Sequence, residues 1–312
     1  NSHYETRYNQ MKHRMECRKK GEDDFVMLDD MVSNSIWMEL NEAGYPCSVK
    51  NMENLIYSDF SFSYHPIREY MNHLPQWDSI DHIGRLAESV HTIPDQREFW
   101  LKGFRHFLVG MVAAATQEEV VNHLCLLLCS KQNLEKTTFI NKILSDDLRT
   151  DYLSTGIISA GNKDDLSRMS EYMLINFDEF EGMTGHELSL LKDLITRKFI
   201  SIRLPYARHT LNLPHWASFA GTCNYPQVLY DPTGNRRFLC YEIEKIDRYE
   251  IDYPQLYAQI KHLLDTGYRY WFEADENDEI ERNNKPFIFQ TPEEEMLLPH
   301  FRKPERFESF KY

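Results

Sequence analysis

The sequence has no long hydrophobic run, no secretory signal and no cysteine pair of the kind that binds zinc. The longest candidate for a membrane segment, residues 124–128, has only the length of a strand, whereas a membrane-spanning helix needs about 20 apolar residues. The first residues, NSHYETRYNQ, contain neither a starting Met nor an apolar signal core, so we expect residues upstream of this sequence. These absences favour a soluble, cytoplasmic protein without a membrane partner.

The six cysteines form no CxxC pair and no Cys/His cluster with zinc spacing. We therefore expect them to be reduced thiols. Cys125 and Cys129 lie in or beside an apolar run, where packing as small hydrophobic side chains is the expected role.

Positive charge is also scarce, because the formal net charge is −14. The long-range field of such a molecule does not attract nucleic acid, so any contact with nucleic acid requires a local basic patch. Hydrophobic residues make up 42% of the 312 residues, which is enough to form a folded core and excludes a disordered chain.

The pattern of caps and apolar residues divides the chain into two parts. Residues 1–94 are expected to form a mostly helical accessory domain, with Asn34 or Ser35 capping a helix that stops at Gly44 and Ser48 capping the next. A longer helix follows from TIPDQREFW, and its apolar residues recur at helical spacing. Residues 95–312 are expected to form the second domain.

Three apolar runs of strand length follow in the second domain: VVNHLCLLL, YMLINFD and WASFAGTCN. They alternate with helical stretches at 136–144 and 186–196, which predicts a mainly parallel sheet with helices on both faces, a three-layer α/β core. From about residue 248 the pattern is helical again, with Pro254 at a first helical position and a further signal in TPEEEMLL.

The stretch CSKQNLEKTTFI joins the first strand to a helix that opens with Lys136, Thr137 and Thr138. Strand, loop and helix in this order are the layout of a phosphate loop, in which Lys reaches the β and γ phosphates and a hydroxyl ligates Mg²⁺. The glycines of GxxxxGK[ST] are absent, because Ser130 and Glu135 occupy their positions. An ordinary helix start remains the alternative interpretation.

An acidic pair, Asp178 and Glu179, follows the strand MLINF. At the carboxyl end of a parallel strand beside the loop, Asp178 could hold Mg²⁺ and Glu179 could orient a water molecule. A helix cap is the alternative.

Two later motifs fit the same arrangement. SFAGTCN ends in Asn224, which could place an amide near a γ phosphate, and DPTGNRRFL presents Arg236 and Arg237 after a turn, where a guanidinium could act on a neighbouring subunit's nucleotide. The alternatives are a turn asparagine and surface arginines on a strand.

In this order the motifs resemble the virulence-associated E type ATPases of bacterial mobile elements, relatives of superfamily III helicases and primase-helicases. The resemblance runs from about Ser33 to the end and is carried by KTTFI, GNKDDLS, MLINFDEFE, LKDLITRKFISIRLPYAR, SFAGTCN and DPTGNRRFLCYEI. It implies an AAA+-like P-loop NTPase core, ATP and Mg²⁺ as cofactors, and a homo-oligomer, a hexameric ring, that moves DNA as a helicase or translocase. Single-stranded DNA would pass through the channel of the ring.

The resemblance also implies roles for individual residues. Nucleotide would be bound by Gln132, Lys136, Thr137 and Thr138, and the metal by Thr137 and Asp178. The catalytic residues would be Glu179, Asn224 and, acting on a neighbouring subunit, Arg236 or Arg237. DNA would be bound by Lys198, Arg203 and Arg208. A solvated strand face is the alternative for the three DNA-binding residues.

Glu135 is the main departure from the family pattern, which has glycine next to the lysine. A carboxylate about 4 Å from a phosphate, at an effective dielectric near 20, costs on the order of 4 kcal/mol, or roughly three decades in affinity. Two functions therefore remain open. One is an ATP-dependent DNA helicase or translocase of a mobile element or phage with a degenerate Walker A loop; the other is an impaired, helicase-derived module that binds DNA or protein without hydrolysing ATP.

Overall fold

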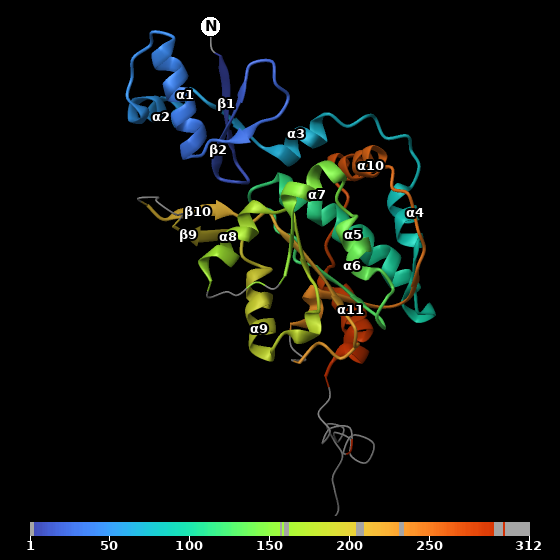
Figure 1. The fold of residues 1–312 in the computed structure, drawn as a ribbon. Helices are drawn as coiled ribbons and strands as arrows, with labels where there is room; N and C mark the ends of the chain where they lie inside the picture. Colours follow the sequence, from blue (N-terminus) through green and yellow to red (C-terminus); the bar gives the residue numbers. More distant parts are fainter. Residues whose placement is uncertain are drawn as a thin grey trace, which may run out of the picture.

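The computed structural model describes residues 3–156, 158, 162–203, 209–230, 234–289 and 296. These residues form an N-terminal α/β unit and a larger α/β body, which lie side by side in Figure 1.

The N-terminal unit contains a four-stranded sheet in the order β3-β2-β1-β4. Its strands are β1 (Tyr4–Asn9), β2 (Arg14–Lys19), β3 (Val26–Met27) and β4 (Phe62–Tyr64), and its helices are α1 (Asp30–Glu42) and α2 (Val49–Ile56). A small core joins helices and sheet through Met15, Cys17, Leu28, Ile36, Met52 and Ile56. The sequence did not predict these strands, because polar and charged residues dominate β1 and hide its period of two.

The predicted helix ends are partly confirmed. Ser48 caps α2 by accepting a hydrogen bond from the Asn51 N–H, and Gly44 follows α1 with φ 83°. The cap of α1 is Asp29 rather than Asn34 or Ser35, because the helix begins five or six residues earlier than predicted.

The larger body is built on a six-stranded sheet in the order β5-β12-β6-β11-β8-β7. The strands are β5 (Val90–Thr92), β6 (Cys125–Cys129), β7 (Leu153–Thr155), β8 (Leu174–Phe177), β11 (Ser218–Cys223) and β12 (Phe238–Ile246). Only the edge strand β5 is antiparallel to its neighbour, and the other four pairings are parallel. The prediction of a mainly parallel sheet is therefore confirmed.

Helices cover both faces of this sheet (Figure 1). Along β6 the side chains alternate, so that Leu126 and Leu128 join one core cluster while Leu127 joins the other. The first face is covered by α3 (Pro66–Asn72), α4 (His82–Glu88), α5 (Arg97–Thr116), α6 (Lys136–Asn141), α7 (Asp146–Tyr152) and α10 (Tyr253–Asp265). The second face is covered by α8 (Lys163–Glu171) and α9 (Gly185–Leu194), and α11 (Asn277–Asn284) contacts β12.

Residues 66–92 pack on the larger body, although they precede the predicted domain boundary at residue 94. Ile67 and Ile83 are fully buried in the core of that body, and β5 pairs with β12. The predicted helix from TIPDQREFW is α5, and Pro254 lies in the first turn of α10. TPEEEMLL lies outside the described residues, apart from Met296.

A two-stranded antiparallel hairpin, β9 (Phe199–Ile202) and β10 (Leu211–Pro214), connects α9 to β11. Its tip, residues 204–208, lies outside the described residues, and so does Arg208.

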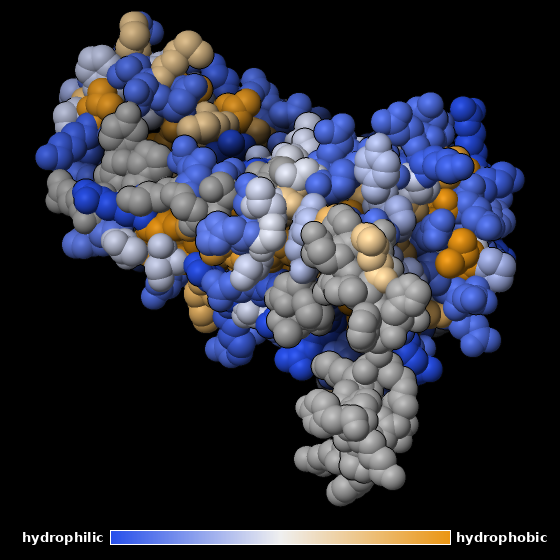
Figure 2. Space-filling model, turned by 90° about the horizontal axis from the view of Figure 1, so that it is seen from below, coloured by the Kyte–Doolittle hydropathy of each residue, from blue (hydrophilic) through white to orange (hydrophobic). Residues whose placement is uncertain are grey.

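The surface seen in Figure 2 is mostly hydrophilic, with hydrophobic side chains in small groups. No helix among the described residues is both long and apolar enough to cross a bilayer.

Candidate functional site

The carboxyl ends of β6, β8 and β11 lie next to one another at one edge of the large sheet. Cys129 pairs with Cys223 and Phe177 pairs with Gly221 in the parallel registers. The residues that follow these strands, Ser130, Asp178 and Asn224, therefore meet at this edge, where ligands of open parallel sheets bind.

The loop after β6 uses left-handed backbone at two residues that are not glycine. Asn133 has φ 71° and Glu135 has φ 53°. A left-handed conformation at a residue with a side chain costs roughly 1–2 kcal/mol, and glycine adopts it at no such cost. The loop thus retains a backbone shape that glycine favours, with glutamate directly before Lys136.

Lys136 is buried, and its ammonium points back into the loop. Nζ donates to Ser130 Oγ at 2.8 Å, to Ser130 O at 3.1 Å and to Lys131 O at 3.2 Å. Burial lowers the pKa of Lys136, while the charges of Glu181 and Asp178 act in the opposite direction. These acids are therefore close enough to stabilise the ammonium.

One carboxylate oxygen of Asp178 accepts hydrogen bonds from two hydroxyl groups. Thr137 Oγ1 donates to Asp178 Oδ1 at 3.0 Å, and Thr222 Oγ1 donates to the same atom at 2.9 Å. The predicted pair of Thr137 and Asp178 is thus in direct contact. Thr222 was not predicted; its position just before Cys223 at a strand end is the signal that could have found it.

Glu179 is exposed and has a left-handed backbone, with φ 56° and ψ 52°. Because such a conformation is costly for a residue with a side chain, it is typical of positions that the surrounding structure holds for function. The carboxylate faces solvent at the same edge as Asp178.

Asn224 contacts an acid that the sequence did not reveal. Its backbone N–H and its side-chain Nδ2 donate to Glu181 Oε1 at 3.1 and 2.8 Å. The other oxygen of this carboxylate, Oε2, is buried and has no hydrogen-bond partner. An orphaned carboxylate oxygen of this kind is suited to a cation or to an ordered water molecule.

Cys129 and Cys223 are paired as a disulfide between β6 and β11, directly before Ser130 and Asn224. The expectation of six reduced thiols is therefore wrong for these two residues, because parallel pairing places their side chains on the same face of adjacent strands. Cys17, Cys47, Cys125 and Cys240 are free, and the buried Cys125 packs in the core as predicted.

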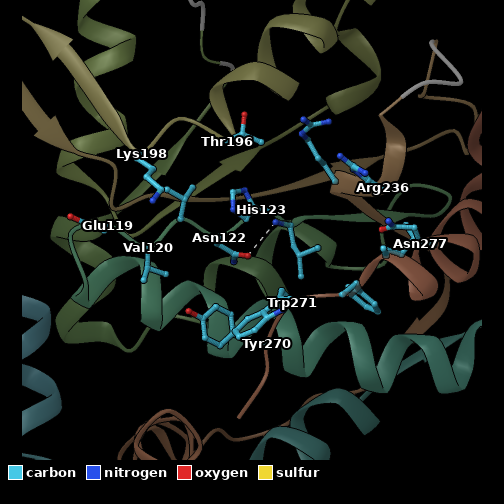
Figure 3. Close-up of a pocket in the computed structure, with 16 residues that line it drawn as sticks. Glu119, Val120, Asn122, His123, Thr196, Lys198, Arg236, Tyr270, Trp271 and Asn277 are labelled. Carbon is cyan, nitrogen blue, oxygen red and sulfur yellow. Dashed lines mark hydrogen bonds between the residues drawn. The ribbon is translucent and has the colours of Figure 1, made fainter. Parts of the chain in front are cut away.

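Three predicted basic residues lie at the opposite edge of the sheet. Arg236 and Arg237 precede β12, whose first residue, Phe238, pairs with the first residue of β6. Lys198 precedes β9, and all three side chains line one cavity with a volume of about 720 Å³. Figure 3 shows Lys198 and Arg236 on one side of this cavity.

Gln132, Thr138 and Arg203 are described by their exposure and by the surfaces they line. Gln132 is exposed in the loop, and Arg203 is exposed just after β9. Thr138 lines a cavity of about 630 Å³ together with Glu135, Phe139, Lys142 and residues 246–251. No local sequence pattern indicates this cavity, since its walls come from three segments that are distant in the sequence.

Among the described residues, no group of three or more His, Cys, Asp or Glu side chains could hold a metal on its own. Mg²⁺ does not require such a cage, because it is commonly held by one or two carboxylates, water molecules and phosphate oxygens. The hydroxyl of Thr137, the carboxylate of Asp178 and the orphaned Glu181 Oε2 are donors of the type that this ion prefers.

The fold and the site define an α/β protein with a parallel-rich sheet and a Lys, Thr and Asp cluster at the carboxyl edge. A family model described as "Virulence-associated protein E-like domain" matches residues 71–288. The chain belongs to this family, which confirms the resemblance of its motifs.

The solved structures that match this chain include two of one protein region. "The apo structure of NrS-1 C terminal region (305-718)" matches with 12% identity and a TM-score of 0.48, over 96% of this chain and 73% of that chain. "The A form apo structure of NrS-1 C terminal region-CTR" matches with 12% identity and a TM-score of 0.49, over 95% and 72%. No curated protein matches the chain.

Proposed function

We propose that this chain is an ATP-hydrolysing motor of a mobile element or phage, with an AAA+-like P-loop core, that acts on DNA as a helicase or translocase. The observation that carries the proposal is the meeting of Lys136, Thr137 and Asp178 at the carboxyl edge of adjacent parallel strands. A phosphate lysine, a hydroxyl and a carboxylate in this arrangement are the parts that phosphoryl transfer requires.

In this proposal Lys136 exchanges its three bonds to loop oxygens for bonds to the β and γ phosphates. Glu179 orients the attacking water, since it follows Asp178 and faces solvent. Asn224 lies beside the γ phosphate, and Glu181 fixes the orientation of its amide. Residues of the cavity that Thr138 and Glu135 line would contact the nucleoside.

Mg²⁺ would neutralise phosphate charge in this site, and Thr137 and Asp178 would hold it. Asp178 Oδ1 already accepts from Thr137 and Thr222, so these hydroxyl groups orient the carboxylate. Gln132 lies in the exposed part of the loop, where it could contact phosphate.

Arg236 and Arg237 lie at the edge of the sheet away from Lys136, so in this proposal they serve the nucleotide of a neighbouring copy. That requirement supports a closed ring, since head-to-tail contacts repeat from copy to copy. Lys198, Arg203 and Arg208 are proposed to contact DNA, with sequence-independent binding to phosphate.

Hydrolysis of ATP with Mg²⁺, measured with and without single-stranded DNA, tests the proposal. Lys136→Ala should abolish binding, whereas Glu179→Gln should keep binding and lower turnover by at least about 100-fold. Lys261→Ala, on the exposed side of α10, is the matched control for the lysine. Equal turnover in the parent and in both site variants would refute the proposal.

A helicase-derived module that binds DNA or protein without hydrolysis is the second candidate. It is favoured by Glu135, which carries a negative charge directly before the phosphate lysine. Nucleotide binding by the parent without any turnover would support this candidate.

A further inference from the structure

The cavity at the amino-terminal edge of the sheet combines positive charge with aromatic rings. We call it the cationic–aromatic cavity; it has a volume of about 720 Å³ and is lined by Glu119, His123, Lys198, Arg236, Arg237 and Trp271 among other residues. A volume in this range suits a ligand of nucleotide size. Figure 3 shows Lys198 and Arg236 across the cavity from Tyr270 and Trp271.

The cations of this cavity have few protein partners. Lys198 and Arg236 are exposed, and their side chains form no hydrogen bond or ion pair with the residues that the structure describes. Among the described residues, Arg237 donates one long hydrogen bond, from Nη1 to Gly234 O at 3.4 Å, and its buried Nε finds no partner there. Three cations together form a local basic patch in a chain of net charge −14, and such a patch attracts an anion.

The surroundings confirm that this positive charge is concentrated. Partial burial lowers the pKa of His123, and the nearby Arg237 and Lys198 lower it further. Glu119 is the one carboxylate among the described lining residues. The field inside the cavity therefore favours phosphate over a neutral ligand.

The aromatic wall contributes a flat, partly solvated surface. Trp271 is 50% exposed and packs edge-on against Tyr270, with ring centroids 5.2 Å apart. An exposed tryptophan beside unpaired cations is the combination that single-stranded nucleic acids use, because bases stack on the ring and phosphates pair with the charges. Duplex bases are already stacked on one another, so a duplex would leave the Trp271 face unused.

We infer that the cationic–aromatic cavity binds one nucleotide unit of a single-stranded nucleic acid, with its base on Trp271 and its phosphate against Lys198. The site lies outside the Lys136 cluster and needs no nucleoside triphosphate. It rests on the proposed function only in that the chain acts on nucleic acid.

Binding of a fluorescein-labelled dT15 to the full chain, measured by anisotropy at low salt without nucleotide, tests the inference. Trp271→Ala should weaken binding about 10-fold, and Lys198→Gln should reduce the slope of log affinity against log salt by about 1. Tyr45→Ala, another exposed aromatic residue, and Lys50→Gln, an exposed lysine, are matched controls on the N-terminal unit. Glu119→Gln should tighten binding about threefold, a gain that misfolding cannot produce.

Photocrosslinking of an oligonucleotide that carries 5-iododeoxyuridine provides an independent measurement. Crosslinked peptides should contain Tyr270 or Trp271, and free ATP should not displace the strand. If the parent binds dT15 and every variant binds it with the same affinity, the inference is overturned and the proposed function remains intact. If the parent hydrolyses ATP but does not bind dT15, the inference is also overturned. If the parent binds dT15 through Trp271 and Lys198 but does not hydrolyse ATP, the inference is supported and the proposed function fails. Displacement by ATP at Trp271 would mean that the cavity takes a free nucleotide, which overturns the assignment to a strand.

Discussion

Asn224 donates its backbone N–H and its side-chain amide to the same oxygen of Glu181, at 3.1 and 2.8 Å. These two hydrogen bonds fix the amide at the end of β11. The other carboxylate oxygen, Glu181 Oε2, is buried and has no hydrogen-bond partner. Glu181 is therefore placed to orient Asn224 and to supply negative charge beside Lys136.

Glu181→Gln tests that second role, because glutamine retains an acceptor for Asn224 and removes the charge. We expect ATP to bind more tightly without Mg²⁺, since a negative charge near phosphate is removed, and the gain in affinity on adding Mg²⁺ to shrink about tenfold. Titration calorimetry with and without Mg²⁺ measures both effects. The exposed Glu244→Gln is the control, and an unchanged Mg²⁺ dependence would remove Glu181 from the site.

Glu135→Gly should raise the affinity for Mg²⁺-ATP by at least about tenfold, because it removes a carboxylate next to the phosphates. It should also stabilise the fold by about 1 kcal/mol, since the residue has a left-handed backbone. Asn133→Gly changes the backbone at the other left-handed position without changing charge, and Glu135→Gln changes the charge alone. Equal ATP affinity in the parent and Glu135→Gln would contradict the electrostatic explanation.

Stability should fall as the pH decreases below about 6.5. Burial lowers the pKa of His215 to about 4, as it does for His13, His65 and His106. Because the pKa is lower in the folded state, the unfolded chain binds more protons between pH 6.5 and 4. The stabilisation is complete above pH 6.5 and is lost towards pH 4, at about 1.4 kcal/mol per pH unit for each fully affected histidine.

Denaturant unfolding at pH 7 and pH 5 measures this loss. His215 is 1% exposed, and its Nδ1 bonds to Arg197 O at 2.8 Å, so His215→Asn keeps a donor and removes the titrating ring. The variant should lose less stability than the parent between the two pH values, whereas His186→Asn at an exposed position should behave like the parent. An identical pH dependence in all three proteins would contradict the prediction.

Reduction of the bond between Cys129 and Cys223 should destabilise the fold. The two residues are separated by 94 positions, and closing a loop of that size contributes about 4–5 kcal/mol in the chain-entropy estimate. A double variant, Cys129→Ala with Cys223→Ala, should unfold at the same denaturant concentration with and without reductant. Alkylation of the unfolded, unreduced chain should modify four thiols, and modification of all six would disprove the bond.

The sheet was predictable because its central strands are apolar on both faces, as in the residues before Ser130, Asp178 and Asn224. That pattern also predicts which strand ends meet, and it places Lys136, Thr137 and Asp178 at the same edge of the sheet. The N-terminal strands were not predicted, because their exposed faces are charged and the hydrophobic core of the N-terminal unit is small.

Side-chain contacts that depend on the register between strands could not be predicted. Thr222 and Glu181 reach the site only through the alignment of β11 with β8, and the pairing of Cys129 with Cys223 depends on the alignment of β11 with β6. Nothing in local sequence shows such alignments. The cavity that Lys198 and Arg236 line together likewise joins segments that are distant in the sequence.

β6 and β12 run in the same direction, with the loop that leads to Lys136 after one and Arg236 and Arg237 before the other. A strand of five residues separates its two ends by roughly 16 Å. Under the proposed function, a single molecule therefore does not bring these guanidinium groups to its own nucleotide, and ATP turnover per molecule should fall on dilution. On the same proposal, two inactive variants, one lacking Lys136 and the other lacking Arg236 and Arg237, should regain ATP turnover when mixed.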